Sequence, residues 1–69
     1  MDFRAKPQRT AEPTQEDLRA MESLERRVLL SVNGRRSLGE IASRQGIIDD
    51  AQVEQVVEGL QRKGWIRLT

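Results

Sequence analysis

The sequence contains no cysteine, no histidine and no tyrosine, and it has one tryptophan and one phenylalanine among 69 residues. Without cysteine the chain forms no disulfide and offers no thiolate to a metal ion. Without histidine it lacks the most common general base, the most common zinc ligand and the usual pH switch. These absences favour a fold held by a small apolar core and argue against a metal site.

Signatures of catalysis are also missing. The sequence shows no glycine-rich phosphate loop, no metal-ligand spacing and no pairing of a nucleophile with a base. A lone carboxylate has little catalytic capacity without a second acid, a metal or a histidine. We therefore expect a protein that is not an enzyme, with no catalytic residues, no cofactor, no metal and no small-molecule substrate.

The charges nearly balance, with 12 basic and 11 acidic residues and a net charge of +1. A dedicated nucleic-acid binder generally shows a clear basic excess. No run approaches the roughly 18 apolar residues of a membrane span, and the N-terminus lacks the apolar core of a signal peptide. We expect a cytoplasmic protein that does not contact a membrane.

Residues 1–13 predict an arm without regular structure. Prolines occupy positions 7 and 13, Phe3 is the one large apolar residue after Met1, and no periodicity is visible. The segment is slightly basic, so it is either an arm that follows phosphates or a solvated tail. Residues 14–69 predict a single domain.

The first predicted helix covers residues 15–32. Thr14 precedes it as an N-cap, and Asp17 completes the spacing of a capping box. Apolar side chains recur at helical spacing along one face: Leu18, Met21, Leu24, Val28, Leu29 and Val32. Asn33-Gly34 follows as a helix stop, since glycine adopts the left-handed conformation at little cost.

Two shorter helices and a strand follow. Capping residues and glycines delimit one helix within residues 37–46 and another within residues 49–64. Both have an apolar side that faces a common core. Residues 65–68 then predict a strand that pairs with an extended piece at residues 35–37.

One acid on the first predicted helix needs a partner. Glu25 falls within the apolar face, between Met21 and Leu29. A buried carboxylate requires a cation, and Arg36 and Arg44 are the candidates. We interpret this residue as part of a structural ion pair or as an exposed residue at the edge of the apolar face.

The segment Leu29-Leu-Ser-Val-Asn-Gly-Arg-Arg-Ser-Leu-Gly-Glu-Ile-Ala42, with Val57-x-x-Leu60-x-x-x-Gly64-Trp-Ile66, resembles the winged-helix superfamily over residues 18–68. The first segment is also similar to the helical half of the small peptide chaperones of pyrroloquinoline-quinone biosynthesis, which bind leader peptides. The resemblance implies a mainly α, three-helix winged-helix-like (helix-turn-helix) domain with a short C-terminal β-strand. The turn after Gly46 is one residue longer than in common DNA-reading versions, and the wing is incomplete.

A protein partner or a homodimer is the favoured interpretation. Leu30 projects away from the apolar face of its helix, and Ile48 lies in the turn before the last helix. Trp65 and Arg67 belong to the final strand, whose edge is open to pairing. Exposed apolar residues of this kind mark protein-binding sites when they gather into a patch. The chain is thus predicted to serve as a binding module in regulation or assembly.

A DNA-binding regulator is the alternative. In a helix-turn-helix protein the last of three helices enters the major groove, where glutamine pairs with adenine. The candidate residues are Arg35, Arg36, Gln52, Gln55, Arg62 and Lys63, and Arg26, Arg27 and Arg44 are candidates to extend the basic pair at 35–36. However, acids crowd the first half of that helix, at Asp49, Asp50, Glu54 and Glu58. Because phosphate neutralisation supplies most affinity for duplex DNA, these acids oppose binding.

Overall fold

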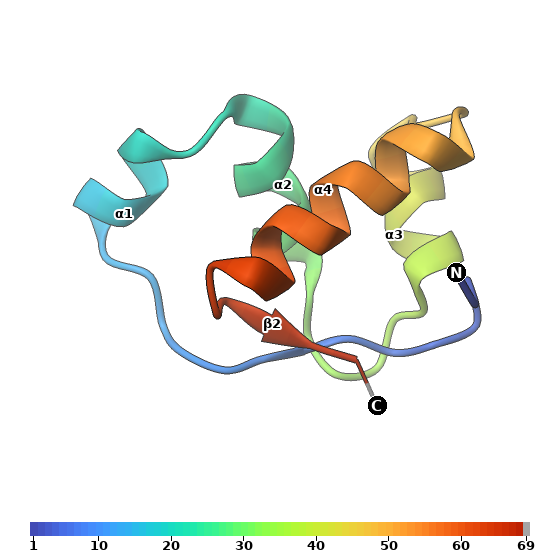
Figure 1. Ribbon diagram of the computed structural model, residues 1–69, viewed down its shortest axis with the longest axis horizontal. Helices are drawn as coiled ribbons and strands as arrows, with labels where there is room; N and C mark the ends of the chain where they lie inside the picture. Colours follow the sequence, from blue (N-terminus) through green and yellow to red (C-terminus); the bar gives the residue numbers. More distant parts are fainter. Residues whose placement is uncertain (69) are drawn as a thin grey trace.

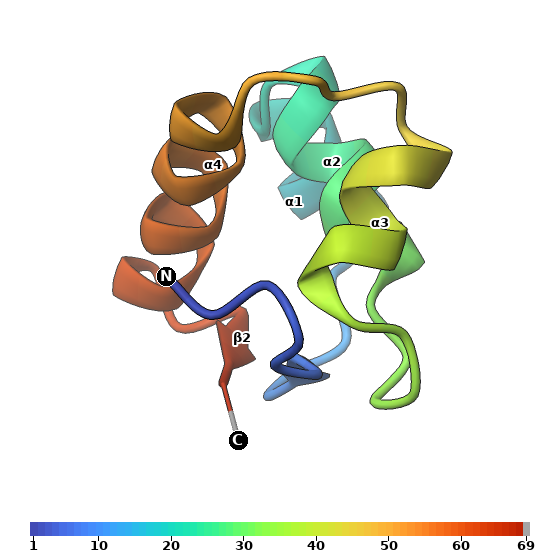
Figure 2. The same ribbon diagram turned by 90° about the vertical axis from the view of Figure 1, so that its right-hand side faces the viewer.

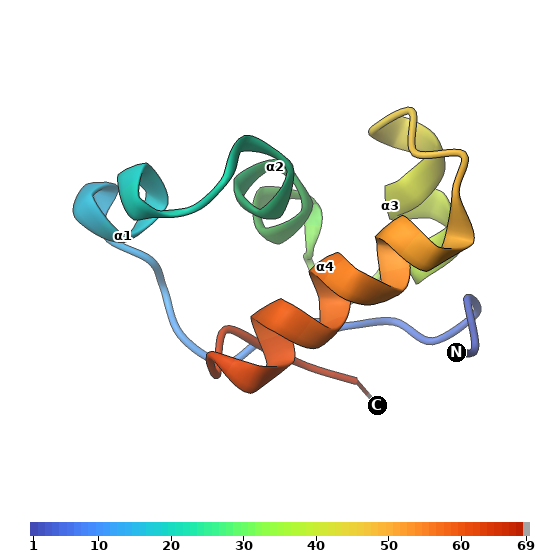
Figure 3. The ribbon, with the colours of Figure 1, turned by 45° about the horizontal axis from the view of Figure 1, so that its top comes forward.

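A computed structural model describes residues 1–68 as a mainly helical fold with a two-stranded antiparallel sheet. The elements in chain order are β1 (Gln8–Arg9), α1 (Gln15–Ala20), α2 (Ser23–Ser31), α3 (Leu38–Arg44), α4 (Asp50–Arg62) and β2 (Ile66–Arg67). Helix α2 lies between α1 and α3, and α4 crosses it (Figures 1 and 3). The predicted class, mainly helical with a short C-terminal strand, is confirmed, although four helices form in place of three.

The predicted helix over residues 15–32 is wrong, because it breaks into α1 and α2. Met21 and Glu22 adopt extended backbone, with ψ of 151° and 153°. The break turns the Met21 side chain into the core, where it is 8% exposed. The Arg26 guanidinium donates to the carbonyl of Leu18 at 3.3 Å, which also accepts the N–H of Met21, so this contact ties α2 to the end of α1.

Helices α2, α3 and α4 share one apolar core. Leu29 of α2 and Leu60 of α4 are wholly excluded from solvent. The buried hydrophobic side chains are Met21, Val28, Leu29, Val32, Leu38, Ile41, Ala42, Val53, Val57, Leu60 and Ile66. These residues come from the faces that the helical spacing predicts, and Leu18, Leu24 and Val56 pack half-buried at the margin.

The three side chains predicted to cap the N-termini of helices do so. Thr14 and Ser37 each form a capping box with the acidic residue three positions later. Asp49 accepts a hydrogen bond from the backbone N–H of Ala51 at 3.0 Å. After α2 the chain turns at Gly34, whose φ of 78° lies in the left-handed region that glycine tolerates.

The unstructured arm predicted for residues 1–13 is wrong, because this segment packs along the helices (Figure 2). Strand β1 pairs antiparallel with β2, with Gln8 opposite Arg67 and Arg9 opposite Ile66. Pro7, which directly precedes β1, is fully buried. The segment therefore belongs to the folded unit.

The N-terminal segment also completes the start of α3. The N–H of Leu38 donates to the carbonyl of Ala5, and the N–H of Gly39 donates to the carbonyl of Phe3, both at 2.9 Å. These donors belong to the first turn of a helix, where no intrahelical acceptor exists. With the Ser37 capping box, the segment satisfies the first turn of α3.

The strand partner predicted at residues 35–37 is also wrong, since β1 takes that place. The side-chain carbonyl of Asn33 accepts hydrogen bonds from the backbone N–H groups of Arg35 and Arg36, both at 2.9 Å. This arrangement curls the α2–α3 connection into a turn, so its backbone donors are occupied locally and do not form a ladder.

Replacing Ser37 with alanine should lower the free energy of unfolding by about 1 kcal/mol, because the N–H of Glu40 loses its acceptor. Ser43 is the matched control: it is exposed in the same helix, and Ser43→Ala should change stability by less than about 0.5 kcal/mol. Urea unfolding followed by circular dichroism measures both. Equal shifts in the two midpoints would contradict the contribution of the cap.

Candidate interaction surfaces

Arginine side chains hold the C-terminal end of α2. The Arg9 guanidinium donates through Nε to the carbonyl of Leu29 at 3.2 Å and through Nη2 to that of Leu30 at 3.1 Å. Arg36 donates to the carbonyl of Ser31 at 3.3 Å. Because the last turn of α2 contains no basic residue of its own, these two side chains supply the positive charge that a helix C-terminus favours.

Arg27 donates in the same way to the C-terminal end of α3, where its guanidinium lies 3.4 Å from the carbonyl oxygen of Gln45. This places Arg27 at the opposite end of α3 from Arg35 and Arg36. Arg26 is held against α1. That Arg26, Arg27 and Arg44 extend the basic pair at 35–36 stays a prediction.

The partner of Glu25 is Lys63, whose Nζ lies 3.0 Å from Oε2. Arg36 and Arg44, the partners predicted from the sequence, do not form this pair. The side chain of Glu25 is 16% exposed and that of Lys63 is 53% exposed. The pair joins α2 to the end of α4, and its exposure limits its contribution to less than about 1 kcal/mol.

Basic residues from three segments meet where the N-terminal segment, the α2–α3 turn and β2 adjoin. Gln8 lies at the centre of this region. Its side-chain carbonyl accepts a hydrogen bond from Arg67 at 3.3 Å, and an ideal Cβ on Gly34 would lie 3.6 Å from its Cγ. We name this surface the basic edge; its basic residues are Arg9, Arg35 and Arg67. The sequence did not reveal it, because residues 1–13 were expected to lack regular structure.

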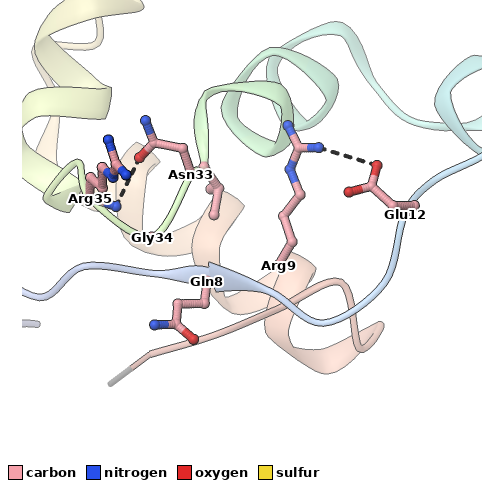
Figure 4. Close-up of a pocket in the computed structure, with 7 residues that line it drawn as sticks. Gln8, Arg9, Glu12, Asn33, Gly34 and Arg35 are labelled. Atoms are coloured by element: carbon pink, nitrogen blue, oxygen red, sulfur yellow. Dashed lines mark hydrogen bonds and ion pairs between the residues drawn. The ribbon is translucent and has the colours of Figure 1, made fainter.

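A hollow of about 580 Å³ opens in the basic edge (Figure 4). Arg9 and Glu12 form an ion pair at 3.5 Å on one side of it, and Asn33 and Arg35 lie on the other side. The lining residues are Gln8, Arg9, Glu12, Val32, Asn33, Gly34 and Arg35. The lining is mostly polar, because Val32, its one apolar side chain, is buried.

Ile48 stands out at the other end of α3, in the α3–α4 turn. It is 96% exposed, while its neighbour Ile47 packs against the core. The turn is fixed on both sides: the N–H of Ile47 donates to the carbonyl of Ala42 at 2.9 Å, and Asp49 caps α4. We name residues 46–50 the Ile48 turn. It presents a large apolar side chain on a well-anchored loop.

Charged residues of both signs lie near Ile48. Asp49 and Asp50 follow it directly and are exposed, and Glu54 on α4 forms an ion pair with the N-terminal ammonium of Met1 at 3.3 Å. Arg44 is exposed in the last turn of α3, just before the turn. Negative charge at the start of α4 also suits the N-terminus of a helix. The Ile48 turn therefore combines an exposed apolar side chain with two adjacent aspartates.

The residues predicted for protein binding lie in separate places. Leu30 is 50% exposed at the end of α2, whereas Ile48 lies beyond the far end of α3. Trp65 is half-buried against the core, and its carbonyl accepts the N–H of Thr10 at 2.9 Å. Arg67 is exposed on β2. They do not form one continuous patch.

The residues predicted for DNA binding are also dispersed. Arg35 and Arg36 precede α3, whereas Gln52 and Gln55 are exposed on the first half of α4, which begins beyond the other end of α3 (Figures 1 and 2). The remaining two, Arg62 and Lys63, lie at the end of α4. Thirteen residues of helix separate the two ends of α4 by about 20 Å. The cations therefore do not flank the two glutamines.

Comparison of the chain with protein-family models, with curated proteins and with solved structures found no match. Within residues 1–68 no helix has the length and apolar character needed to cross a membrane. The same part of the chain contains no cluster of acidic side chains arranged to hold a metal ion.

Arg9→Met should lower the free energy of unfolding by about 1–2 kcal/mol, because two carbonyls at the end of α2 lose a charged donor. Arg19→Met is the matched control, since Arg19 is exposed on α1 and makes no comparable contact with α2. Thermal and urea unfolding measure both variants. If Arg9→Met is as stable as the control, the carbonyl contacts do not support the fold.

Proposed function

We propose that this chain is a non-catalytic, winged-helix-like binding module whose ligand is a protein. The observation that carries the proposal is the Ile48 turn, where a 96% exposed isoleucine stands on an anchored loop. The order of elements supports the likeness in fold: α3, a tight turn and α4 precede β2, which lies in a small sheet.

An anchored apolar side chain is suited to docking. Burying an isoleucine side chain gains about 1.5–3 kcal/mol relative to leaving it exposed. Because Gly46, Asp49 and the contact of Ile47 already fix the turn, docking orders little additional chain. A preorganised anchor therefore keeps most of the gain from burial as binding free energy.

A DNA-binding regulator remains the second candidate, since Gln52 and Gln55 are exposed on α4 as base-reading side chains would be. The charges weigh against it. Asp49 and Asp50 stand at the leading end of the same helix, and the cations predicted to contact phosphates lie elsewhere. A polyanion placed against this end of α4 would meet repulsion.

Affinity capture from the source cells tests the protein-binding proposal. The wild-type chain should retain at least one protein that the Ile48→Ser variant loses by about tenfold or more, which corresponds to about 1.4 kcal/mol. Gln61→Ala, an exposed change at the far end of α4, is the control and should retain that protein. The proposal is wrong if no captured protein depends on Ile48.

Titration with short duplex DNA tests the second candidate. We expect no complex at about 50 mM salt, where phosphate contacts would be strongest. A complex that weakens steeply towards about 200 mM salt, and that Gln52→Ala or Gln55→Ala disrupts, would establish the regulator in place of the protein-binding module.

A further inference from the structure

We infer that two copies of this chain pair through their Ile48 turns, about a two-fold axis that passes between the two isoleucine side chains. The inference rests on the proposed function, because it names a second copy of the chain as the protein partner. Two observations carry it: Ile48 is 96% exposed on an anchored turn, and the charges on the two sides of the turn have opposite signs.

The charges at this end of the fold are divided between the two helices that the Ile48 turn joins. On the α3 side, Arg44 is exposed in the last helical turn, and the Arg27 guanidinium lies 3.4 Å from the carbonyl oxygen at the end of α3. On the α4 side, Asp49 and Asp50 are exposed at the start of the helix. The turn therefore separates two cations from two carboxylates.

The remaining charges near the turn balance each other, since Glu54 forms its ion pair with the N-terminal ammonium of Met1 at 3.3 Å. Arg44 and Asp50 differ in this respect. Within residues 1–68, neither the Arg44 guanidinium nor the Asp50 carboxylate lies within ion-pair distance of an opposite charge. Both groups are therefore available to a partner molecule.

A two-fold axis through the Ile48 turn matches the two signs of charge. The turn spans the gap between the end of α3 and the start of α4 (Figure 2). Rotation about the axis places the α3 side of each copy against the α4 side of the other, so Arg44 of each copy faces Asp50 of the other. Each ion pair then occurs twice, as a symmetric interface requires.

The isoleucine contact supplies affinity, and the charges supply orientation. The two Ile48 side chains meet near the axis, and their removal from water favours association. Because the turn is already fixed by the contact of Ile47 and the Asp49 cap, pairing orders little additional chain. Exposed ion pairs add little affinity, but they disfavour the parallel arrangement, in which like charges would face each other.

The arrangement has a definite stoichiometry. Each copy uses its one Ile48 turn in the contact, so association stops at a dimer. A contact made by one turn buries less area than a standard interface, and we expect a dissociation constant of about 0.1–1 mM.

Sedimentation velocity of the full chain over a concentration series, up to about 1 mM, tests the inference. The mean mass of the wild-type chain should rise towards that of a dimer and no further, and added salt should weaken the association. Ile48→Ser removes the apolar contact and should leave the chain monomeric over the same range. Arg19→Glu, an exposed charge reversal on α1, is the control and should associate as the wild type does.

Arg44→Glu and Asp50→Arg test the ion pairs. Each change alone places like charges against each other twice in a dimer, so each should weaken the association by about tenfold. Both residues are exposed, and Asp49 remains the cap of α4, so circular dichroism should show that both variants are folded.

Mixing these two variants gives the decisive result. In a mixed dimer, the changed residue at position 44 of one copy meets the changed residue at position 50 of the other, and the second ion pair keeps its native residues. Both pairs regain opposite signs, so the mixture should associate about as well as the wild type. A mixture that stays as weak as either variant, or a wild-type chain that stays monomeric at every concentration, would overturn the inference.

The same measurements separate this inference from the proposed function. If the wild-type chain is monomeric while affinity capture still retains a different protein that depends on Ile48, the inference fails and the proposed function stands. If neither association nor capture depends on Ile48, both fail.

Nuclear magnetic resonance provides a second readout that needs no variant. Dilution of the wild-type chain should shift the backbone amide signals of residues 44–50 and leave those of residues 32–35, at the other end of α3, unchanged. Concentration-dependent shifts at residues 32–35, or no shifts at residues 44–50, would overturn the symmetric pairing.

Discussion

The ends of short helices set the main constraint on this structure. A helix leaves its first four N–H groups and its last four carbonyls without intrahelical partners. In helices of six, nine and seven residues, these end groups outnumber the internal hydrogen bonds. The N-terminal segment supplies partners of both kinds. The carbonyls of Phe3 and Ala5 accept hydrogen bonds from N–H groups at the start of α3, and the Arg9 side chain donates to carbonyls at the end of α2. The helical core and this segment therefore depend on each other.

This constraint changes how the basic residues are interpreted. From the sequence alone, every arginine is an equal candidate for a surface that binds anions. In the structure, Arg9, Arg26, Arg27 and Arg36 donate to backbone carbonyls at helix ends, and Lys63 neutralises a half-buried acid. Many of the basic side chains therefore stabilise the fold. Cations occur at both ends of α3, with Arg35 before it and Arg44 in its last turn.

Features governed by neighbouring residues could be predicted from the sequence, and features governed by distant contacts could not. The caps at Thr14, Ser37 and Asp49 and the buried faces of the helices follow from local spacing. The exposure of Leu30 follows from the same spacing, and Ile48 lies in the turn where the sequence placed it. The break at Met21 and strand β1 lack a local signal, because burial of a side chain and hydrogen bonds to remote backbone groups stabilise them. The hollow is lined in part by that strand, so it could not be predicted from the sequence either.

The β1–β2 pairing joins residues at a large sequence separation, since Gln8 contacts Arg67 across 59 positions. Closing so long a loop has a high entropic cost before the contact can stabilise anything, and non-local pairings of this kind slow folding. During synthesis, a nascent chain can complete the sheet only after residue 67 has left the ribosome. The start of α3 can be capped earlier, because its partners Phe3 and Ala5 precede it in the chain.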